Sequence, residues 1–338
     1  MASFNDDQGG YVIGVILVVI GSLCLLALFV LLYFNIYNVF DNYRTLHFIR
    51  DILILGLGVA LIVMGSLLIQ RTVIMNIVKN YSIDIKNYKF DENILKNVKV
   101  YEIDKNINLP ESVNLRSRMP PVLFQGILKS CGANATSNCL RFHQTDKNKY
   151  QPSRLFIHYN ARIIQGGDGK VDHGTSSAGL MQALMQYNAC DEWTWPYDTF
   201  NFSTRPSAKA YEQAKSKKPV VCGWIWNTKD DNLLIALKQN LYKNKPVVFS
   251  ADIFNSFVKL NKKYKIPLFT GNVPMPSQKD SLIGGHMMLL CGYDDTKQHF
   301  IVQNSLSTLV GDSGYFYFPY DYIKQHGYEF FTFEYAES

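Results

Sequence analysis

Clustered basic residues, paired cysteines and low-complexity tracts are all missing from this sequence of 338 residues. Its net charge of +6 comes from scattered Lys and Arg residues with no basic stripe, so nucleic acid is not an expected partner. The six Cys residues have no paired spacing, and because Cys24 lies in an apolar stretch, an odd number remains elsewhere. A disulfide framework is therefore not expected, and a reducing compartment is favoured.

Charged residues are also absent from two long stretches near the N-terminus, 11–34 and 52–70. Each stretch is about as long as a helix that crosses the hydrocarbon layer of a membrane. A pair of buried core helices is one alternative. A cleaved signal peptide is another for the first stretch, but Asp6 and Asp7 precede it where a signal peptide carries cations. We expect two transmembrane helices that form a hairpin and insert into a lipid bilayer.

The hairpin would place the N-terminus and everything after it on one side of the membrane. Basic residues are more frequent just after the second stretch than in the loop between the stretches, and such a bias marks the cytosolic side. They are Arg71, Lys79, Lys86 and Lys89 after the second stretch, and Arg44 and Arg50 in the loop. This pattern favours a multi-pass membrane protein with two spans and a cytosolic C-terminal part.

Three segments are expected along the chain: a membrane anchor over 1–71, a polar linker over 72–108 and a globular domain over 109–338. The linker has no firm hydrophobic period, and one short helix is expected near its end. In the globular domain helical patterns come first and short β-rich runs follow. Helices are expected over 131–143, after Pro152-Ser153, after Ser176-Ser177 and over 230–242, and strands over 246–251, 286–293, 299–303 and 314–319. This order indicates an α+β domain of two packed halves.

Cys131 is the strongest candidate for a reactive side chain. A lone Cys is most often a small buried hydrophobic residue. A helix that begins at Ser130-Cys131, however, would place this thiol at the positive end of the helix dipole, which favours the thiolate. Gln125 lies six residues earlier in a turn-like segment and could direct its side-chain amide at the same point. With the backbone amide of Cys131 it would form an oxyanion hole.

A thiolate that attacks a peptide bond also needs a proton carrier for the leaving amine, and His286 is the best candidate. Gly284 and Gly285 precede it and permit close backbone approach, and a buried strand follows. Asn304 ends the next expected strand, so its amide oxygen could hold the His286 ring in one tautomer. A satisfied core His and a turn Asn are the alternatives. Four other histidines lie in polar or helical settings with nothing special nearby: His143, His158, His299 and His326.

Five separated motifs surround these residues, at 109–116 with 120–131, at 172–174, at 195–198, at 284–286 with 292–295, and at 303–305 with 311–315. In their order and spacing they resemble the papain-like cysteine peptidases over residues 109 to about 322. The resemblance is greatest to the short forms of bacteria, archaea and large DNA viruses, which read Ser-Cys-x-Ala-Asn-Ala as residues 130–135 do.

The resemblance implies a two-lobed papain-like fold, here preceded by the transmembrane hairpin. A helical lobe would carry Cys131, and a β lobe would carry His286 and Asn304, with an extended polypeptide substrate in the cleft between them. The backbone carbonyl of Gly285 would bind the residue before the scissile bond. The implied activity is that of a cysteine endopeptidase acting through a thioester acyl-enzyme, with no metal and no organic cofactor.

Departures from the family pattern are concentrated after Asn304. The family usually has Trp and then Gly at the positions of Leu306 and Ser307, and a second Trp at Val310. Leu306 offers less cover to the His–Asn hydrogen bond than Trp would, so a slower enzyme is expected. Leu128 replaces a Cys of the secreted members, in agreement with a reducing compartment. The linker is much shorter than cathepsin propeptides, so it is not expected to occlude the cleft.

Three other functions stay open at this point. The first is a catalytically weak or inactive membrane-bound protein that binds extended peptides in the same cleft, and Leu306 is its best support. The second is a mainly structural, scaffolding role. The third is a transpeptidase, which would pass the thioester to an amine or thiol instead of water.

Overall fold

The structure is a computed structural model that describes residues 15–26, 53–66, 98–144, 149–225, 231–258 and 270–336. The chain divides into two compact units, 1–78 and 79–338.

The first unit contains the two stretches that were expected to cross a membrane. Its described residues form one helix over 15–26 and another over 53–66. A transmembrane helix needs roughly 20 residues. No helix among the described residues is both long enough and apolar enough to span a bilayer, so the prediction of a two-span membrane protein with a cytosolic domain is wrong.

The second unit is built on one mixed sheet whose strands run in the order β1-β3-β8-β4-β5-β6-β7, with β2 paired to β5. β1 pairs with β3 in parallel, and the other neighbours are antiparallel. The strands are β1 (Lys99–Tyr101), β2 (Ser112–Asn114), β3 (Val220–Ile225), β4 (Val247–Phe254), β5 (Leu282–Asp294), β6 (His299–Gln303), β7 (Tyr315–Pro319) and β8 (Gly327–Tyr335).

Helices of the second unit mostly precede the central strands in the chain, as the sequence pattern predicts. They are α4 (Cys131–Phe142), α5 (Arg154–Ile164), α6 (Ser177–Tyr187), α7 (Ala208–Lys215), α8 (Asp231–Tyr242) and α10 (Tyr320–His326), with short 3-10 turns η2 (Arg116–Arg118), η4 (Thr199–Asn201) and η5 (Asn255–Phe257). Ser153 and Ser176 cap α5 and α6 by accepting hydrogen bonds from backbone N–H groups of the first turn. Both helices therefore begin where Pro152-Ser153 and Ser176-Ser177 predict.

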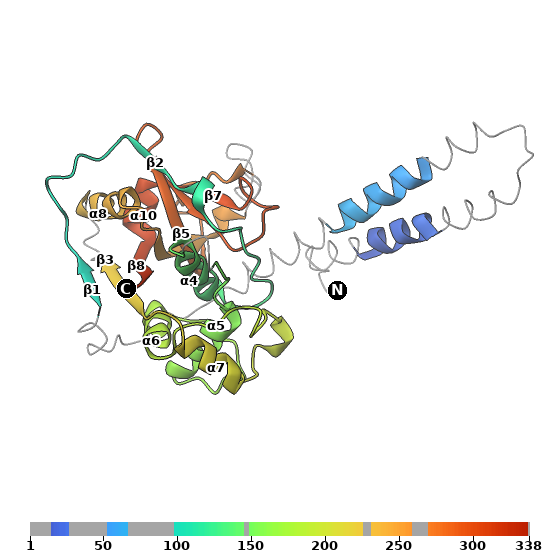
Figure 1. The fold of residues 1–338 in the computed structure, drawn as a ribbon. Coiled ribbons are helices and arrows are strands. Elements are labelled where there is room, and N and C mark those ends of the chain that lie inside the picture. The colour runs from blue at the N-terminus through green and yellow to red at the C-terminus, as the bar shows by residue number, and fades with distance from the viewer. Residues whose placement is uncertain are drawn as a thin grey trace, which may run out of the picture. The chain divides into compact units, whose positions relative to one another are not determined.

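Helix α4 lies between β5 on one side and the helices α5, α6 and α7 on the other (Figure 1). Because α4 and α8 contact it, β5 is buried almost without interruption from Gly285 to Tyr293. The largest buried side chains of the sheet are aromatic: Phe249, Tyr293, Phe300, Phe316, Phe318, Phe330, Phe331 and Phe333, and Tyr322 of α10 joins them. This packed core fixes α4 against β5, and the α+β fold with a helical half and a strand half is confirmed.

Three residues in the last part of the expected linker over 72–108 form a strand of the sheet, β1. Lys99 and Tyr101 of β1 lie opposite Gly223 and Ile225 of β3. The Tyr101 hydroxyl donates to a carboxylate oxygen of Glu334 in β8 at 2.7 Å. The short helix expected over 91–98 falls almost wholly outside the described residues. The last part of the linker is therefore integrated into the sheet.

Candidate active site

Cys131 is the first residue of α4, as predicted, and it is 2% exposed. The backbone N–H of Met287 in β5 donates a hydrogen bond to Sγ of Cys131 at 3.4 Å. The thiol thus lies where the helical half meets the sheet, beside the residue that follows His286. The helix N-terminus and this N–H both place partial positive charge at the sulfur, which stabilises a thiolate.

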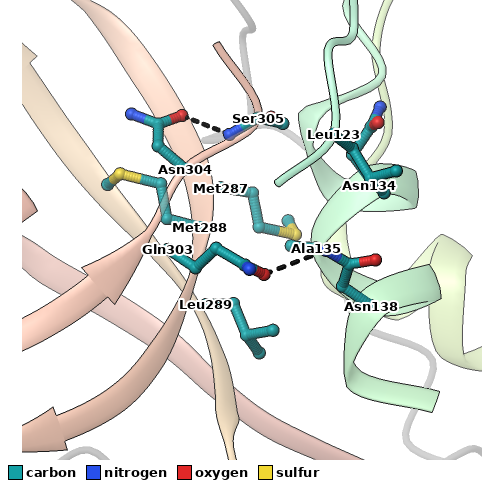
Figure 2. Close-up of a pocket in the computed structure, with 10 residues that line it drawn as sticks. All are labelled: Leu123, Asn134, Ala135, Asn138, Met287, Met288, Leu289, Gln303, Asn304 and Ser305. Atoms are coloured by element: carbon teal, nitrogen blue, oxygen red, sulfur yellow. Dashed lines mark hydrogen bonds between the residues drawn. The ribbon is translucent and has the colours of Figure 1, made fainter. Parts of the chain in front are cut away.

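His286 and Asn304 form a buried hydrogen-bonded pair. Nε2 of His286 lies 2.8 Å from Oδ1 of Asn304, and the two residues are 6% and 3% exposed. An amide oxygen only accepts, so Nε2 carries the proton and Nδ1 is the basic nitrogen of the ring. Asn304 is itself fixed, because its Oδ1 accepts from the backbone N–H of Ser305 (Figure 2). Its backbone N–H donates to the carbonyl of Gly314.

Burial controls the protonation of His286. Desolvation lowers the pKa of this imidazole to about 4, and the hydrogen bond to Asn304 opposes the shift. The ring is therefore neutral near pH 7. A neutral imidazole is able to take a proton, which is what a general base requires.

Gln125 lies in the turn that leads into α4 and is fully buried. Its backbone N–H donates to the carbonyl of Ser305, its Oε1 accepts from the Ser305 hydroxyl at 2.6 Å, and its Nε2 donates to the carbonyl of Leu128 at 2.9 Å. Gly126 follows with a φ of 62°, a left-handed conformation that favours glycine. The structure therefore brings Gln125 beside the loop of Asn304 and fixes both ends of its amide.

Gly285 directly precedes His286 in β5 and lies opposite Asp252 of β4. It is buried, whereas Leu282, at the start of the same strand, is exposed. The strand therefore leads from an exposed end to the buried pair of His286 and Asn304.

Two polar side chains tie the helix of Cys131 to the strand that leads to Asn304. Nδ2 of Asn138 donates to Oε1 of Gln303 at 2.9 Å, and Nε2 of Gln303 donates to the carbonyl of Pro120 (Figure 2). Both residues are buried, and satisfied polar contacts of this kind specify one relative position of two elements. They hold the two halves of the site in register.

A cavity of about 10 Å³ lies between α4 and the strands β5 and β6. Its lining includes Asn134, Asn138, Met287, Gln303 and Asn304, and Figure 2 shows Gln303 and Asn138 joined across the gap. This volume holds at most one water molecule. The cavity is therefore a small packing gap behind the site and has no room for a peptide side chain.

The other thiols in the sheet unit are weakly acidic, and the described residues contain no cluster that could hold a metal ion. Burial raises the pKa of four thiols to about 12, and none forms a disulfide: Cys139, Cys190, Cys222 and Cys291. Among the residues that the structure describes, no three His, Cys, Asp or Glu side chains group closely enough to hold a metal ion. Cys131 is therefore the best candidate for a reactive thiol in this unit.

The prediction that His158 has nothing special nearby is wrong. Its Nε2 lies 3.0 Å from Oδ1 of Asp172, and Oδ2 of Asp172 accepts from the backbone N–H of Lys129 at 2.6 Å. Burial alone would raise the pKa of Asp172, but the hydrogen bonds from His158, Lys129 and Gly174 lower it to about 2. The sequence motif around Asp172 marked the carboxylate, whereas no local spacing marked its partner in the middle of α5.

Glu329 is a second buried ionisable residue that the sequence did not single out. Its Oε2 accepts from the hydroxyls of Ser177 in α6 and Ser250 in β4, each at 3.0 Å. Burial raises the pKa of this carboxyl, and the two hydroxyls oppose the shift. Ser250 lies opposite Met287, whose N–H contacts the Cys131 sulfur, so this carboxyl is close to the proposed site.

The residues that depart from the family pattern are accommodated by the fold. Leu306 is 1% exposed, Val310 is buried, and Phe124 forms a bridge with Leu306 next to Gln125. The His286–Asn304 pair stays buried in the presence of Leu306. Ser307 has a φ of 80°, the left-handed region that disfavours every residue except glycine. This backbone conformation explains why glycine is the usual residue at the position.

Replacing Ser307 by Gly is therefore expected to raise the free energy of unfolding by up to about 1 kcal/mol. The strain of a left-handed L-residue, about 1 to 2 kcal/mol, exceeds the entropy that glycine loses on folding. Chemical denaturation at equilibrium measures the change. Ser216→Gly is the matched control, because Ser216 has an ordinary φ of −78° and should gain nothing. Equal effects of the two substitutions would contradict the explanation.

Comparisons with known proteins agree with this geometry. The family profile described as papain family cysteine protease matches residues 109–330. An uncharacterized peptidase C1-like protein of Acanthamoeba polyphaga mimivirus is 33% identical over 247 residues, which cover 71% of this chain and 75% of the viral protein. The chain belongs to the papain family of cysteine proteases. It is accordingly a cysteine peptidase, with a homologue in a large virus.

Solved structures show the same fold. Xylellain, a cysteine protease from Xylella fastidiosa, has a TM-score of 0.63 and 29% identity, and the match covers 76% of this chain and 97% of xylellain. Digestive procathepsin L 3 of the Tenebrio molitor larval midgut has a TM-score of 0.53 and 15% identity, covering 77% and 78% of the two chains. The second likeness concerns the fold alone.

Proposed function

We propose that this protein is an endopeptidase that hydrolyses peptide bonds through a Cys–His–Asn site. Cys131 acts as nucleophile, His286 as general acid and base, and Asn304 orients the imidazole. The observation that carries the proposal is the buried contact of 2.8 Å between His286 and Asn304, next to a thiol that accepts a hydrogen bond from the residue after His286. The transmembrane anchor forms no part of this proposal.

In the first half of the reaction, Sγ of Cys131 attacks the substrate carbonyl carbon, and His286 takes the thiol proton at Nδ1. The carbonyl oxygen becomes an oxyanion, which accepts hydrogen bonds from the backbone N–H of Cys131 and from Nε2 of Gln125. His286 then gives its proton to the leaving amine as the C–N bond breaks. A thioester between Cys131 and the acyl part of the substrate remains.

In the second half, His286 removes a proton from water, and the resulting hydroxide attacks the thioester carbon. The same two donors stabilise the second oxyanion, and Cys131 leaves as a thiolate that recovers its proton from His286. The substrate is an extended polypeptide. Its backbone would lie along the start of β5, where the carbonyl of Gly285 could bind the residue before the scissile bond.

The full chain should cleave a pooled fluorogenic peptide library under reducing conditions, and Cys131→Ala should not. Loss of the nucleophile removes the acyl-enzyme route, which costs roughly 10⁴-fold or more in related covalent mechanisms. Cys139→Ala is a matched control, because this thiol lies in the same helix and burial raises its pKa to about 12. It should retain cleavage.

Cleavage by Cys131→Ala would refute Cys131 as nucleophile. If neither the folded parent nor the variant cleaved any peptide, the chain would instead be a peptide-binding member of the family. A product formed with an added amine acceptor, in place of the hydrolysed peptide, would identify a transpeptidase.

A further inference from the structure

The peptide group between Leu128 and Lys129 is hydrogen-bonded at both its C=O and its N–H. Its carbonyl oxygen accepts from Nε2 of Gln125 at 2.9 Å, and its N–H donates to Oδ2 of Asp172 at 2.6 Å. Because a peptide group is planar, fixing the direction of the N–H also fixes the direction of the C=O. The carboxylate of Asp172 therefore determines where the carbonyl that holds the Gln125 amide points.

Asp172 is in turn held by a rigid element. His158 lies in the middle of α5, is fully buried, and contacts Oδ1 of Asp172 through Nε2 at 3.0 Å. The backbone N–H of Gly174 donates to the same oxygen at 3.2 Å. Nδ1 of His158 has no hydrogen-bond partner among the described residues, so the ring's polar contact is the one to Asp172. Burying the unpaired Nδ1 costs free energy of folding. The contact with Asp172 is the polar interaction that this buried ring makes in return.

A charged acceptor suits this position better than a neutral one. A hydrogen bond to an ionised carboxylate is about twice as strong as a neutral one, and it polarises the peptide group that donates it. The polarised Leu128 carbonyl then binds the Gln125 amide more firmly. The segment between Gln125 and Leu128 has little packing of its own to fix it. Gly126 adopts a left-handed conformation, and Ile127 is 69% exposed.

We propose that His158 and Asp172 are positioning residues that hold the Gln125 amide in place for the oxyanion. Their effect passes from the His158 ring to the Asp172 carboxylate, through the Leu128–Lys129 peptide, to Nε2 of Gln125. The other end of the Gln125 amide is fixed by Ser305, next to Asn304. The inference rests on the proposed peptidase function, since an oxyanion donor has a role only in acyl transfer.

Comparing two reactions of the Cys131 thiol distinguishes a positioning role of His158 and Asp172 from a merely structural one. Peptide hydrolysis passes through an oxyanion, whereas alkylation of Cys131 by iodoacetamide does not. Asp172→Asn and His158→Phe should therefore lower kcat for peptide hydrolysis about 10- to 100-fold, with KM nearly unchanged, and leave the alkylation rate within about twofold. His158→Gln, which keeps a donor, should recover part of kcat. A parallel fall in alkylation would overturn the proposal.

Asp168→Asn is the matched control for Asp172→Asn. Asp168 lies in the segment between α5 and α6 that also carries Asp172, and it accepts from the backbone N–H of Lys170, but it is exposed. The N–H of the Leu128–Lys129 peptide donates to Asp172 and not to Asp168. Neither hydrolysis nor alkylation should change in this variant. If Asp168→Asn lowered hydrolysis as much as Asp172→Asn, removal of any negative charge from this segment would explain the loss, and the proposal would fail.

A double-mutant cycle tests whether Asp172 acts through Gln125. Gln125→Ala should lower kcat about 10²- to 10³-fold, the usual effect of losing one oxyanion donor. Adding Asp172→Asn should then cost little more, because the amide that Asp172 positions is already gone. Losses that multiply would overturn the proposal. Full activity of Gln125→Ala would overturn it too, while leaving Cys131 and His286 of the proposed function intact.

The same cycle measured by thermal unfolding needs no turnover. Gln125→Ala and Asp172→Asn should each lower Tm, and the combined variant should lower it by less than the two shifts together, because both side chains hold one peptide group. Additive shifts would overturn the connection between the two residues. This readout stays decisive if the parent protein hydrolyses no peptide, an outcome that would defeat the proposed function alone.

Discussion

Replacement of His286 by Gln is expected to lower kcat/KM for peptide hydrolysis by at least about 10³-fold. Gln has no group that takes up a proton near neutral pH, so the thiol would lose its base and the leaving amine its acid. The pair with Asn304 is buried, and a Gln side chain still offers polar atoms at this place, which limits damage to the fold. Initial rates on a peptide identified from the library measure the loss.

The control for this variant is His299→Gln. His299 begins β6, the strand that leads to Asn304, and its ring packs on Tyr317 at a centroid distance of 4.8 Å, away from Cys131. Hydrolysis should be unchanged in the control. Residual hydrolysis in His286→Gln close to that of the parent would mean that another group carries the proton, and the proposed mechanism would fail.

Acid is expected to destabilise the sheet unit through His286. Its pKa is about 4 in the folded protein and about 6.5 when exposed, so between these values the unfolded chain binds more protons than the folded chain. Stability therefore falls as pH decreases from about 6.5 to about 4, by roughly 3 kcal/mol at most. Urea unfolding at several pH values measures this loss, and His286→Gln should flatten the curve.

Other buried groups also contribute to the change of stability with pH, and the direction of each pKa shift gives the sign. Burial lowers the pKa of His158 and of His143, so both add to the loss of stability as pH falls below about 6.5. Asp172, with a pKa of about 2, adds a further loss below about pH 4. Glu329 acts in the opposite sense, because its raised pKa favours the folded state as pH falls. A slope unchanged by His286→Gln would indicate a resting thiolate–imidazolium pair, whose imidazole is already charged.

Much of the site could be predicted from sequence because its signals are local. A helix that begins at Cys131 follows from the residues around it, and the strand pair of His286 and Asn304 follows from two short apolar runs separated by a turn. Whether their roles match the family pattern stays a prediction until variants are measured.

What could not be predicted depends on contacts between distant elements. His158 and Asp172 come from α5 and the segment after it, and hydrophobic spacing does not reveal which polar side chain of a buried helix meets which loop. The pairing of β1 with β3 joins residues more than 100 positions apart, in a segment whose composition resembles a linker. The prediction of membrane spans uses the length of two apolar stretches and their lack of charge. These properties do not determine where a helix begins and ends, and no described helix is long and apolar enough to cross a membrane.

Strand β1 also bears on how the peptidase should be produced. A fragment that begins at Leu109, where the family profile begins, would lack β1 and leave the outer edge of β3 without its partner. An uncovered edge of backbone N–H and C=O groups is a template for pairing with another chain. Such a fragment would be prone to aggregate through β3, so a shortened version of the protein should keep the residues from 98 onward.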